Sequence, residues 1–167
     1  VFYHGGGFCV GGIATHAPMA AELARQLDLP VISVEYRLAP ENPWPAAPDD
    51  AEAATRWIAE HGGKLLGREF TGLVLCGDSA GGTLTLVTGL ALRDRPAALP
   101  FVLQIPIYPV SDRGETWASS DQFGAGGYGL DGKDIDYYEA AYAPDHSTWR
   151  GSPLKGDLAG LPPTVLV

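Results

Sequence analysis

A serine flanked by glycines is the feature of this sequence most suited to chemistry. Residues 76–82 read CGDSAGG and place Gly77, Ser79 and Gly81 in a G-x-S-x-G pattern. The pattern lies between an expected strand at residues 72–76 and an expected helix that continues to about residue 93. In a nucleophile elbow this context lifts the serine hydroxyl above a sheet, and the glycines let the strand and the helix pack closely. The pattern therefore predicts that Ser79 is a nucleophile for acyl transfer.

A second glycine cluster, HGGG at residues 4–7, precedes the serine motif. Attack on a carbonyl creates an oxyanion, which backbone N–H groups stabilise when no side chain stands between them and the oxygen. Ala80, which follows Ser79 at the start of a helix, is expected to supply one donor. Glycines in a loop after an earlier strand allow further amides to approach the same oxygen. Together the two motifs predict an oxyanion hole beside Ser79.

Other residues of reactive type are interpreted as structural. The two cysteines lie far apart, without the spacing of a metal site, and are expected to be reduced thiols. His16, His61 and His146 are expected to lie in exposed loops and at helix ends, away from catalysis. Asp78 occupies the variable position of the elbow and is assigned no direct catalytic role. No metal ligand set is therefore expected.

Two charged segments, YRLAPE and PDD, and one glycine-rich segment are also considered as candidate sites. The charges of Arg37, Glu41 and Asp50 are expected to hold a loop and cap a helix. The segment GAGGYG at residues 124–129 fits G-x-G-x-x-G, but no expected strand precedes it, so a dinucleotide site is not predicted.

Strands and helices must alternate to position these motifs. Apolar runs predict strands at residues 1–4, 31–36, 72–76, 101–109 and 162–167. Helices are expected over residues 16–30, from residue 48 to about 60, from the elbow to about 93, and over 131–143. The last of these should place Ile135, Tyr138 and Tyr142 on one side, after a long loop at residues 111–130. Apolar strands separated by helices indicate an α/β protein, with a mostly parallel sheet covered on both faces.

Composition limits the classes of function. The chain has 167 residues, 46% hydrophobic, with 11 basic and 20 acidic side chains and a formal charge of −9. This length suits one globular core. Nucleic acid is an unsuitable partner because no basic cluster is present. No apolar run reaches the roughly 20 residues of a membrane span, and a cytoplasmic protein is expected.

Four segments make the chain resemble the hormone-sensitive-lipase family, the bacterial family IV of α/β-hydrolase esterases: HGGGF, YRLAPENPWPAAPDD, GDSAGG and SPLKGDLAGLPPTVLV. The resemblance covers essentially the whole chain in the family's order. It implies hydrolysis of short-chain acyl esters of small molecules, without metal or cofactor. The site residues carried over are Ser79 as nucleophile, Gly5, Gly6 and Ala80 as oxyanion donors, and His4 and Gly7 as supports of the oxyanion loop.

The resemblance also concerns what lies outside the sequence. The family's triad acid and histidine are expected beyond Val167, and its first strands and cap before Val1. Residues 1–167 are thus expected to form the central part of a single α/β-hydrolase domain, incomplete at both ends, with a lid-like loop and short helix at about 111–143. The isolated 167 residues are expected to be inactive, and the parent protein could form homo-oligomers. Two alternatives stay open: a non-catalytic ligand receptor on the same fold, and a serine peptidase of the same fold.

Overall fold

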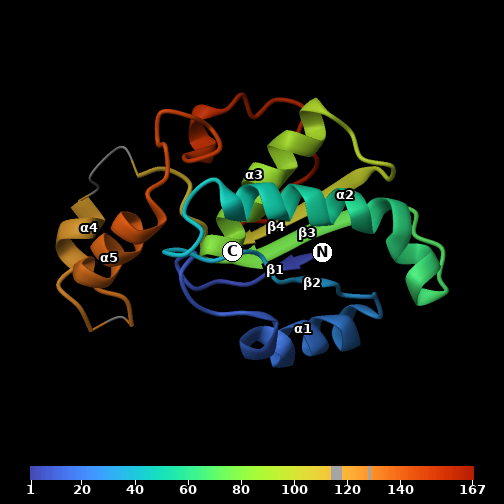
Figure 1. Ribbon diagram of the computed structural model, residues 1–167, viewed down its shortest axis with the longest axis horizontal. Helices are drawn as coiled ribbons and strands as arrows, with labels where there is room; N and C mark the ends of the chain where they lie inside the picture. Colours follow the sequence, from blue (N-terminus) through green and yellow to red (C-terminus); the bar gives the residue numbers. More distant parts are fainter. Residues whose placement is uncertain (114–117, 128) are drawn as a thin grey trace.

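The computed structural model has a parallel sheet between layers of helices, as expected for an α/β protein (Figure 1). The structure describes residues 1–113, 118–127 and 129–167. The strands are β1 (Phe2–Tyr3), β2 (Ser33–Val34), β3 (Leu73–Asp78) and β4 (Phe101–Ile107). They lie in the order β2-β1-β3-β4, and each neighbouring pair is parallel. The β1 and β3 strands, which lead into the two glycine motifs, are therefore neighbours at the centre.

Helices cover both faces of the sheet (Figure 1). Helix α1 (Ile13–Leu27) lies on one face, and α2 (Ala46–Leu66) and α3 (Ala80–Asp94) lie on the other. Two smaller helices, α4 (Ala118–Phe123) and α5 (Gly132–Tyr142), stand to one side, and a 3-10 turn η1 (Pro153–Lys155) follows. Among the helices of the described residues, none combines the length and apolar character needed to cross a membrane.

Burial of apolar side chains between the sheet and the helices forms the core. Tyr3, Leu75 and Leu84 are fully buried members of one cluster that joins β1, β3 and α3. Apolar strands are buried on both faces when helices cover a parallel sheet, which is the reason for their near-continuous hydrophobic runs. The core therefore holds β1 and β3 rigidly at the positions from which the two glycine motifs emerge.

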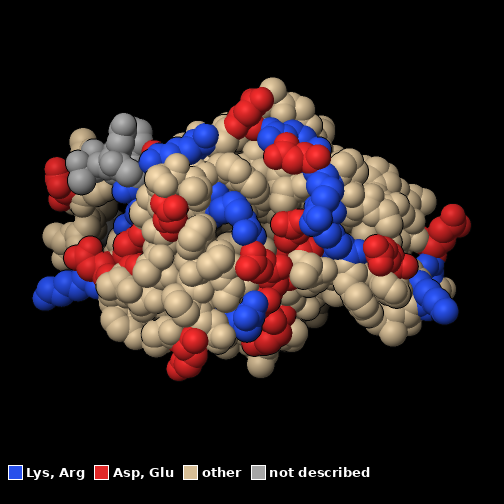
Figure 2. Space-filling view, turned by 45° about the horizontal axis from the view of Figure 1, so that its top comes forward, with Lys and Arg blue, Asp and Glu red and all other residues tan. Residues whose placement is uncertain are grey.

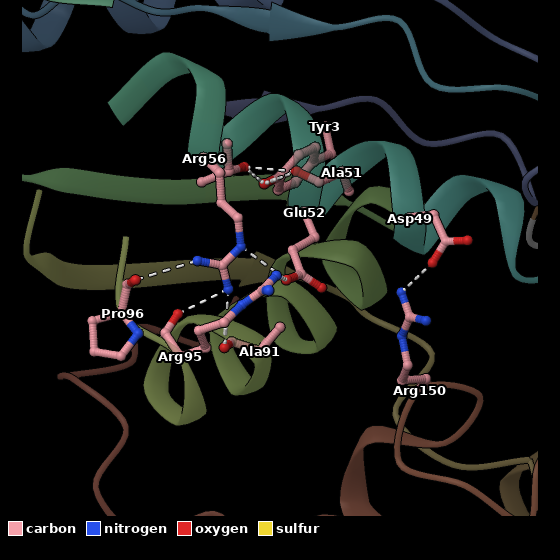
Figure 3. Close-up of polar contacts among 10 residues, drawn as sticks. Tyr3, Asp49, Ala51, Glu52, Arg56, Ala91, Arg95, Pro96 and Arg150 are labelled. Atoms are coloured by element: carbon pink, nitrogen blue, oxygen red, sulfur yellow. Dashed lines mark hydrogen bonds and ion pairs between the residues drawn. The ribbon is translucent and has the colours of Figure 1, made fainter. Parts of the chain in front are cut away.

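Charged side chains fasten the end of α3 that lies away from the elbow (Figure 3). Arg56 on α2 donates from Nε to Glu52 Oε1 at 2.9 Å and from Nη2 to the Arg95 carbonyl oxygen at 2.8 Å. Arg95 Nη2 donates to the same Glu52 oxygen at 2.8 Å. Figure 2 likewise shows acidic and basic side chains next to one another over one face, in keeping with their even spread along the sequence.

The predicted end of helix α2 was wrong. Helix α2 continues to Leu66 instead of ending near residue 60, because Gly62 and Gly63 allow close packing against the chain that follows. A Cβ on Gly62 would lie 2.9 Å from Phe70 Cε2. The helix ends instead at Gly67, whose positive φ of 62° suits a C-terminal cap.

The segment expected as a loop at residues 111–130 contains helix α4. Residues 114–117 and 128 of that segment lie outside the described residues. The helix expected at residues 131–143 is confirmed as α5, with Asp131 as its N-cap, accepting from the Lys133 and Asp134 amides. Residues 162–167 run parallel beside β4, and Val165 N–H donates to the Gln104 carbonyl at 3.0 Å.

Candidate active site

Ser79 stands on a strained turn between β3 and α3. Its φ is 53° and its ψ is −117°, a backbone conformation that residues other than glycine seldom adopt. The Ser79 N–H donates to the Ile107 carbonyl at 2.9 Å, which ties the turn to β4. A Cβ on Gly81 would lie 2.0 Å from the Tyr3 carbonyl oxygen, and one on Gly77 would lie 2.5 Å from the Gly81 backbone. The glycines of the motif are therefore required by close backbone packing.

The HGGG loop turns sharply beside Ser79. Gly6 and Gly7 have positive φ values of 123° and 58°, and the Gly6 carbonyl accepts from the Cys9 and Val10 amides, both at 3.0 Å. Within the described ranges, the amides of Gly6, Gly7 and Ala80 donate to no other group. All three residues line a cavity together with Ser79. This loop can therefore direct free N–H groups toward a ligand in the cavity.

The structure differs from the sequence-based expectation at Gly5. Its N–H donates to Asp78 Oδ1 at 3.0 Å, and Gly5 is not among the residues that line the cavity. Gly7, which was expected only to support the loop, does line it. A hydrogen bond between residues 73 positions apart in the chain cannot be read from the spacing of a local motif.

His4 is buried beneath the glycine loop. Its Nδ1 donates to the Gly5 carbonyl at 2.8 Å, and its ring stacks on Tyr36 with the ring centroids 4.2 Å apart. The Tyr36 hydroxyl donates to the His4 carbonyl at 2.7 Å. Burial lowers the pKa of His4 below its usual range. The neutral ring is thus a structural support under the loop.

The cavity beside Ser79 has a volume of about 190 Å³. One wall is the glycine loop with the start of α3, and α5 forms the opposite wall. The α5 residues Ile135, Tyr138 and Tyr142 all line the cavity, which agrees with the one-sided placement expected from their spacing. Tyr142 also stacks on Phe8 with the ring centroids 3.8 Å apart. The lining is therefore largely apolar and aromatic.

Charged groups also line this cavity. Arg150 Nη2 donates to Asp49 Oδ1 on α2 at 2.7 Å (Figure 3). Arg113 Nε lies 3.8 Å from Glu139 Oε2. Each cavity arginine thus has an acidic neighbour among the described residues.

His146 was expected to be an exposed loop residue, and this was wrong. It is half-buried and lines the cavity, with Nδ1 2.9 Å from Ser152 Oγ and Nε2 bonded to Glu139 Oε1. His16 is also half-buried, with Nε2 3.4 Å from Asp78 Oδ2. Both were missed because their partners are brought close by tertiary packing. No hydrogen bond joins Ser79 Oγ to a histidine in the part of the chain that the structure describes.

Two of the charged residues expected to hold a loop, Arg37 and Asp50, pair with each other away from the cavity. The Arg37 guanidinium donates from Nε and Nη2 to the two oxygens of Asp50, each at 2.8 Å. The contact holds the pKa of the Asp50 carboxyl below its usual value, against the raising effect of its partial burial. Arg37 and Asp50 thus fix the proline-rich loop to the start of α2.

A serine on a strained strand-to-helix turn, beside free amides at a cavity, defines a site of the α/β-hydrolase type. Comparison with known proteins gives the same result. The family model for the alpha/beta hydrolase fold, Abhydrolase_3, matches residues 1–167. The chain therefore belongs to this family of alpha/beta hydrolases, and its resemblance to the hormone-sensitive-lipase group is confirmed.

Several relatives are named as ester hydrolases. The chain is 38% identical to the carboxylesterase NlhH of Mycobacterium tuberculosis over 99% of its length and 53% of that protein. It is 37% identical to an ethyl acetate hydrolase of Pseudomonas putida over 95% of its length and 50% of that protein. It thus spans about half the length of these curated relatives.

A solved structure has the same arrangement of elements. The hyperthermophilic esterase of Pyrobaculum calidifontis superposes with a TM-score of 0.91 at 35% identity, over 99% of this chain and 54% of that chain. A similarity of this size at this identity supports the same overall fold.

Proposed function

We propose that the protein containing this chain is a serine carboxylester hydrolase with Ser79 as its nucleophile. The observation that carries the proposal is the strained Ser79 turn beside the free amides of Gly6, Gly7 and Ala80 at one cavity. Strained serine conformations of this kind occur where the surrounding structure holds a reactive group in place. The named activities of the relatives support the same reaction class.

In the proposed reaction, Ser79 Oγ attacks the acyl carbon of an ester. Its proton passes to a base, the Oγ–C bond forms, and the carbonyl oxygen becomes an oxyanion that the Gly6, Gly7 and Ala80 amides stabilise. Collapse then breaks the bond to the alcohol oxygen, which leaves with the proton. Water repeats the sequence on the acyl-enzyme and releases the acid. Gly5 has no place among the donors because its amide is bonded to Asp78.

We propose that the base and the acid that orients it come from outside these 167 residues. A serine hydroxyl is a weak nucleophile at neutral pH without an adjacent base. His146, which lines the same cavity as Ser79, has Nδ1 bonded to Ser152 and Nε2 bonded to Glu139. With both ring nitrogens engaged, it is poorly placed to take the Ser79 proton.

The proposed substrates are esters of small molecules with short acyl chains. The cavity volume of about 190 Å³ is below the roughly 300–1,000 Å³ typical of pockets for drug-sized ligands. The apolar residues of α5 and Phe8 suit an alkyl chain, and the free amides suit its carbonyl oxygen. A serine peptidase would need a larger opening for its substrate. A non-catalytic receptor would need no nucleophile. No observation favours either alternative.

The first prediction tests the nucleophile in the natural full-length protein. We expect a fluorophosphonate probe to label Ser79 alone, and Ser79→Ala to lower kcat for a p-nitrophenyl acetate substrate by on the order of 10⁴ or more. Substrate affinity should change much less, because the cavity and the donors remain. The matched control is Ser120→Ala on the exposed surface of α4, which should retain labelling and turnover. Labelling at another serine would contradict the assignment, and an inactive, unlabelled wild-type protein would favour the receptor.

A further inference from the structure

Asp78 is a buried carboxylate directly before the proposed nucleophile. It is 8% exposed, and each of its oxygens has a neighbour from a different part of the fold. Oδ1 accepts from the Gly5 amide at 3.0 Å, and Oδ2 lies 3.4 Å from His16 Nε2 on α1. The side chain thus connects the elbow, the glycine loop and α1 at one point.

The Asp78 side chain packs closely against the glycine loop at Gly5. A Cβ on Gly5 would lie 2.2 Å from Asp78 Oδ2, so the carboxylate is packed directly against the loop backbone. Gly5 immediately precedes Gly6 and Gly7, which both line the cavity. A rotation at Gly5 would redirect the amides that follow it, and the hydrogen bond from the Gly5 amide to Asp78 opposes that rotation.

His16 has a polar neighbour at each ring nitrogen. Thr15 Oγ1 donates its single hydrogen to the Gly12 carbonyl at 2.9 Å. His16 Nδ1 lies 2.8 Å from the same hydroxyl oxygen. The other ring nitrogen, Nε2, is the atom presented to Asp78.

We propose that Asp78 is the positioning residue of the oxyanion loop, and that His16 holds it in place from the other side. This inference rests on the proposed function of Ser79. Asp78 touches neither substrate nor reacting atoms; it acts by fixing Gly5 so that the next two amides meet the oxyanion. The oxyanion loop depends on the position of the oxygen that accepts from the Gly5 amide. The negative charge of the Asp78 carboxylate is dispensable for kcat.

Three substitutions separate the position of the acceptor from its charge. Asp78→Asn keeps an oxygen for the Gly5 amide and removes the negative charge. Asp78→Glu keeps the charge but moves the acceptor by one methylene. Asp78→Ala removes both. We expect kcat to stay within about threefold of wild type in Asp78→Asn and to fall by on the order of 10² in Asp78→Ala, with KM changed much less in both.

The experiment measures kcat and KM for a p-nitrophenyl acetate substrate in the natural full-length protein, with kcat normalised to the number of sites that a fluorophosphonate titrates. Glu52→Ala is the matched control. Glu52 is also a carboxylate with two partners, but these are Arg56 and Arg95, away from the cavity. This substitution should lower thermal stability and leave kcat unchanged.

The comparison of Asp78→Asn with Asp78→Ala decides the outcome. Wild-type kcat in Asp78→Ala, or a large loss in Asp78→Asn, would overturn the inference. If Asp78→Ala does not fold, Asp78→Glu takes its place, with low kcat expected and wild-type kcat overturning the inference. Loss of activity in Ser79→Ala together with normal Asp78→Ala turnover would overturn only the inference about Asp78. Full activity in Ser79→Ala would overturn the proposed function as well.

Discussion

The two walls of the cavity are held in different ways. On the Ser79 wall, the backbones of β1, β3 and α3 approach so closely that a Cβ on Gly81 would lie 2.0 Å from the Tyr3 carbonyl oxygen. On the α5 wall, side chains make the contacts, such as the stacking of Tyr142 on Phe8 and the hydrogen bond between His146 Nε2 and Glu139 Oε1. One backbone bond, from the Trp44 amide to the Tyr142 carbonyl at 2.9 Å, also ties the end of α5 to the body.

This difference bears on what each wall can tolerate. A backbone-on-backbone contact has no rotamer that could relieve an added atom, so substitution there must displace an element. A wall of side chains can repack when one residue changes, at a cost set by the volume lost or gained. We therefore expect the Ser79 wall to determine the reaction and the α5 wall to determine which acyl group fits.

The largest effect expected from this comparison is on the glycine loop. Gly6→Val adds a side chain at a φ of 123°, where a Cβ would lie 2.1 Å from the Val10 carbonyl oxygen. The loop must move, so we expect kcat to fall by on the order of 10², as after loss of one oxyanion donor, with KM affected less. Steady-state kinetics of the full-length protein measure this.

Gly67→Val is the control for backbone strain in that experiment. Gly67 also has a positive φ, of 62°, but no atom lies within 4 Å of its added Cβ, and it is absent from the cavity lining. It should lower stability and leave kcat intact. An equal loss of kcat in the two variants would mean that the Ser79 wall is not specially constrained.

A smaller effect is expected on the α5 wall. Ile135→Ala removes apolar volume from the cavity, so the ratio of kcat/KM for a longer acyl ester to that for the acetyl ester should rise by about tenfold. Hydrolysis of a series of p-nitrophenyl esters from acetate to octanoate measures the ratio. Tyr137→Ala, at an exposed neighbour on α5, should leave the ratio unchanged. An unchanged preference in Ile135→Ala would show that α5 does not limit the acyl group.

The smallest expected effect concerns pH and the support beneath the glycine loop. Burial lowers the pKa of His4, so below its usual value of about 6.5 the unfolded chain binds a proton that the folded chain does not. The free energy of unfolding should therefore fall as pH decreases from about 7 to 5, with a contribution from His4 below about 1.4 kcal/mol per pH unit.

Denaturant unfolding at several pH values checks the His4 contribution. We expect His4→Gln to have a shallower pH dependence of stability than wild type. His61→Gln, at a half-exposed histidine on α2, is the matched substitution away from the glycine loop. Identical slopes in wild type and His4→Gln would show that His4 can be protonated within the fold.

Features set by local spacing could be predicted from the sequence. The elbow at Ser79 was predicted because the glycines two residues on either side occupy fixed positions on one strand and one helix. The shared face of Ile135, Tyr138 and Tyr142 on α5 was predicted from helical periodicity, and the structure shows that this face lines the cavity. The α/β class followed from apolar runs that alternate with helices, and the parallel sheet confirms it.

Only the tertiary structure decided which distant groups meet. Asp78 takes the Gly5 amide away from the cavity, His16 reaches Asp78 from α1, and the turn after α5 brings His146 to Glu139 and Ser152. The sequence placed none of these contacts, because a polar side chain can pair with any complementary group within its reach. Its actual partner is fixed by how strands, helices and loops pack, and packing depends on burial summed over the whole core.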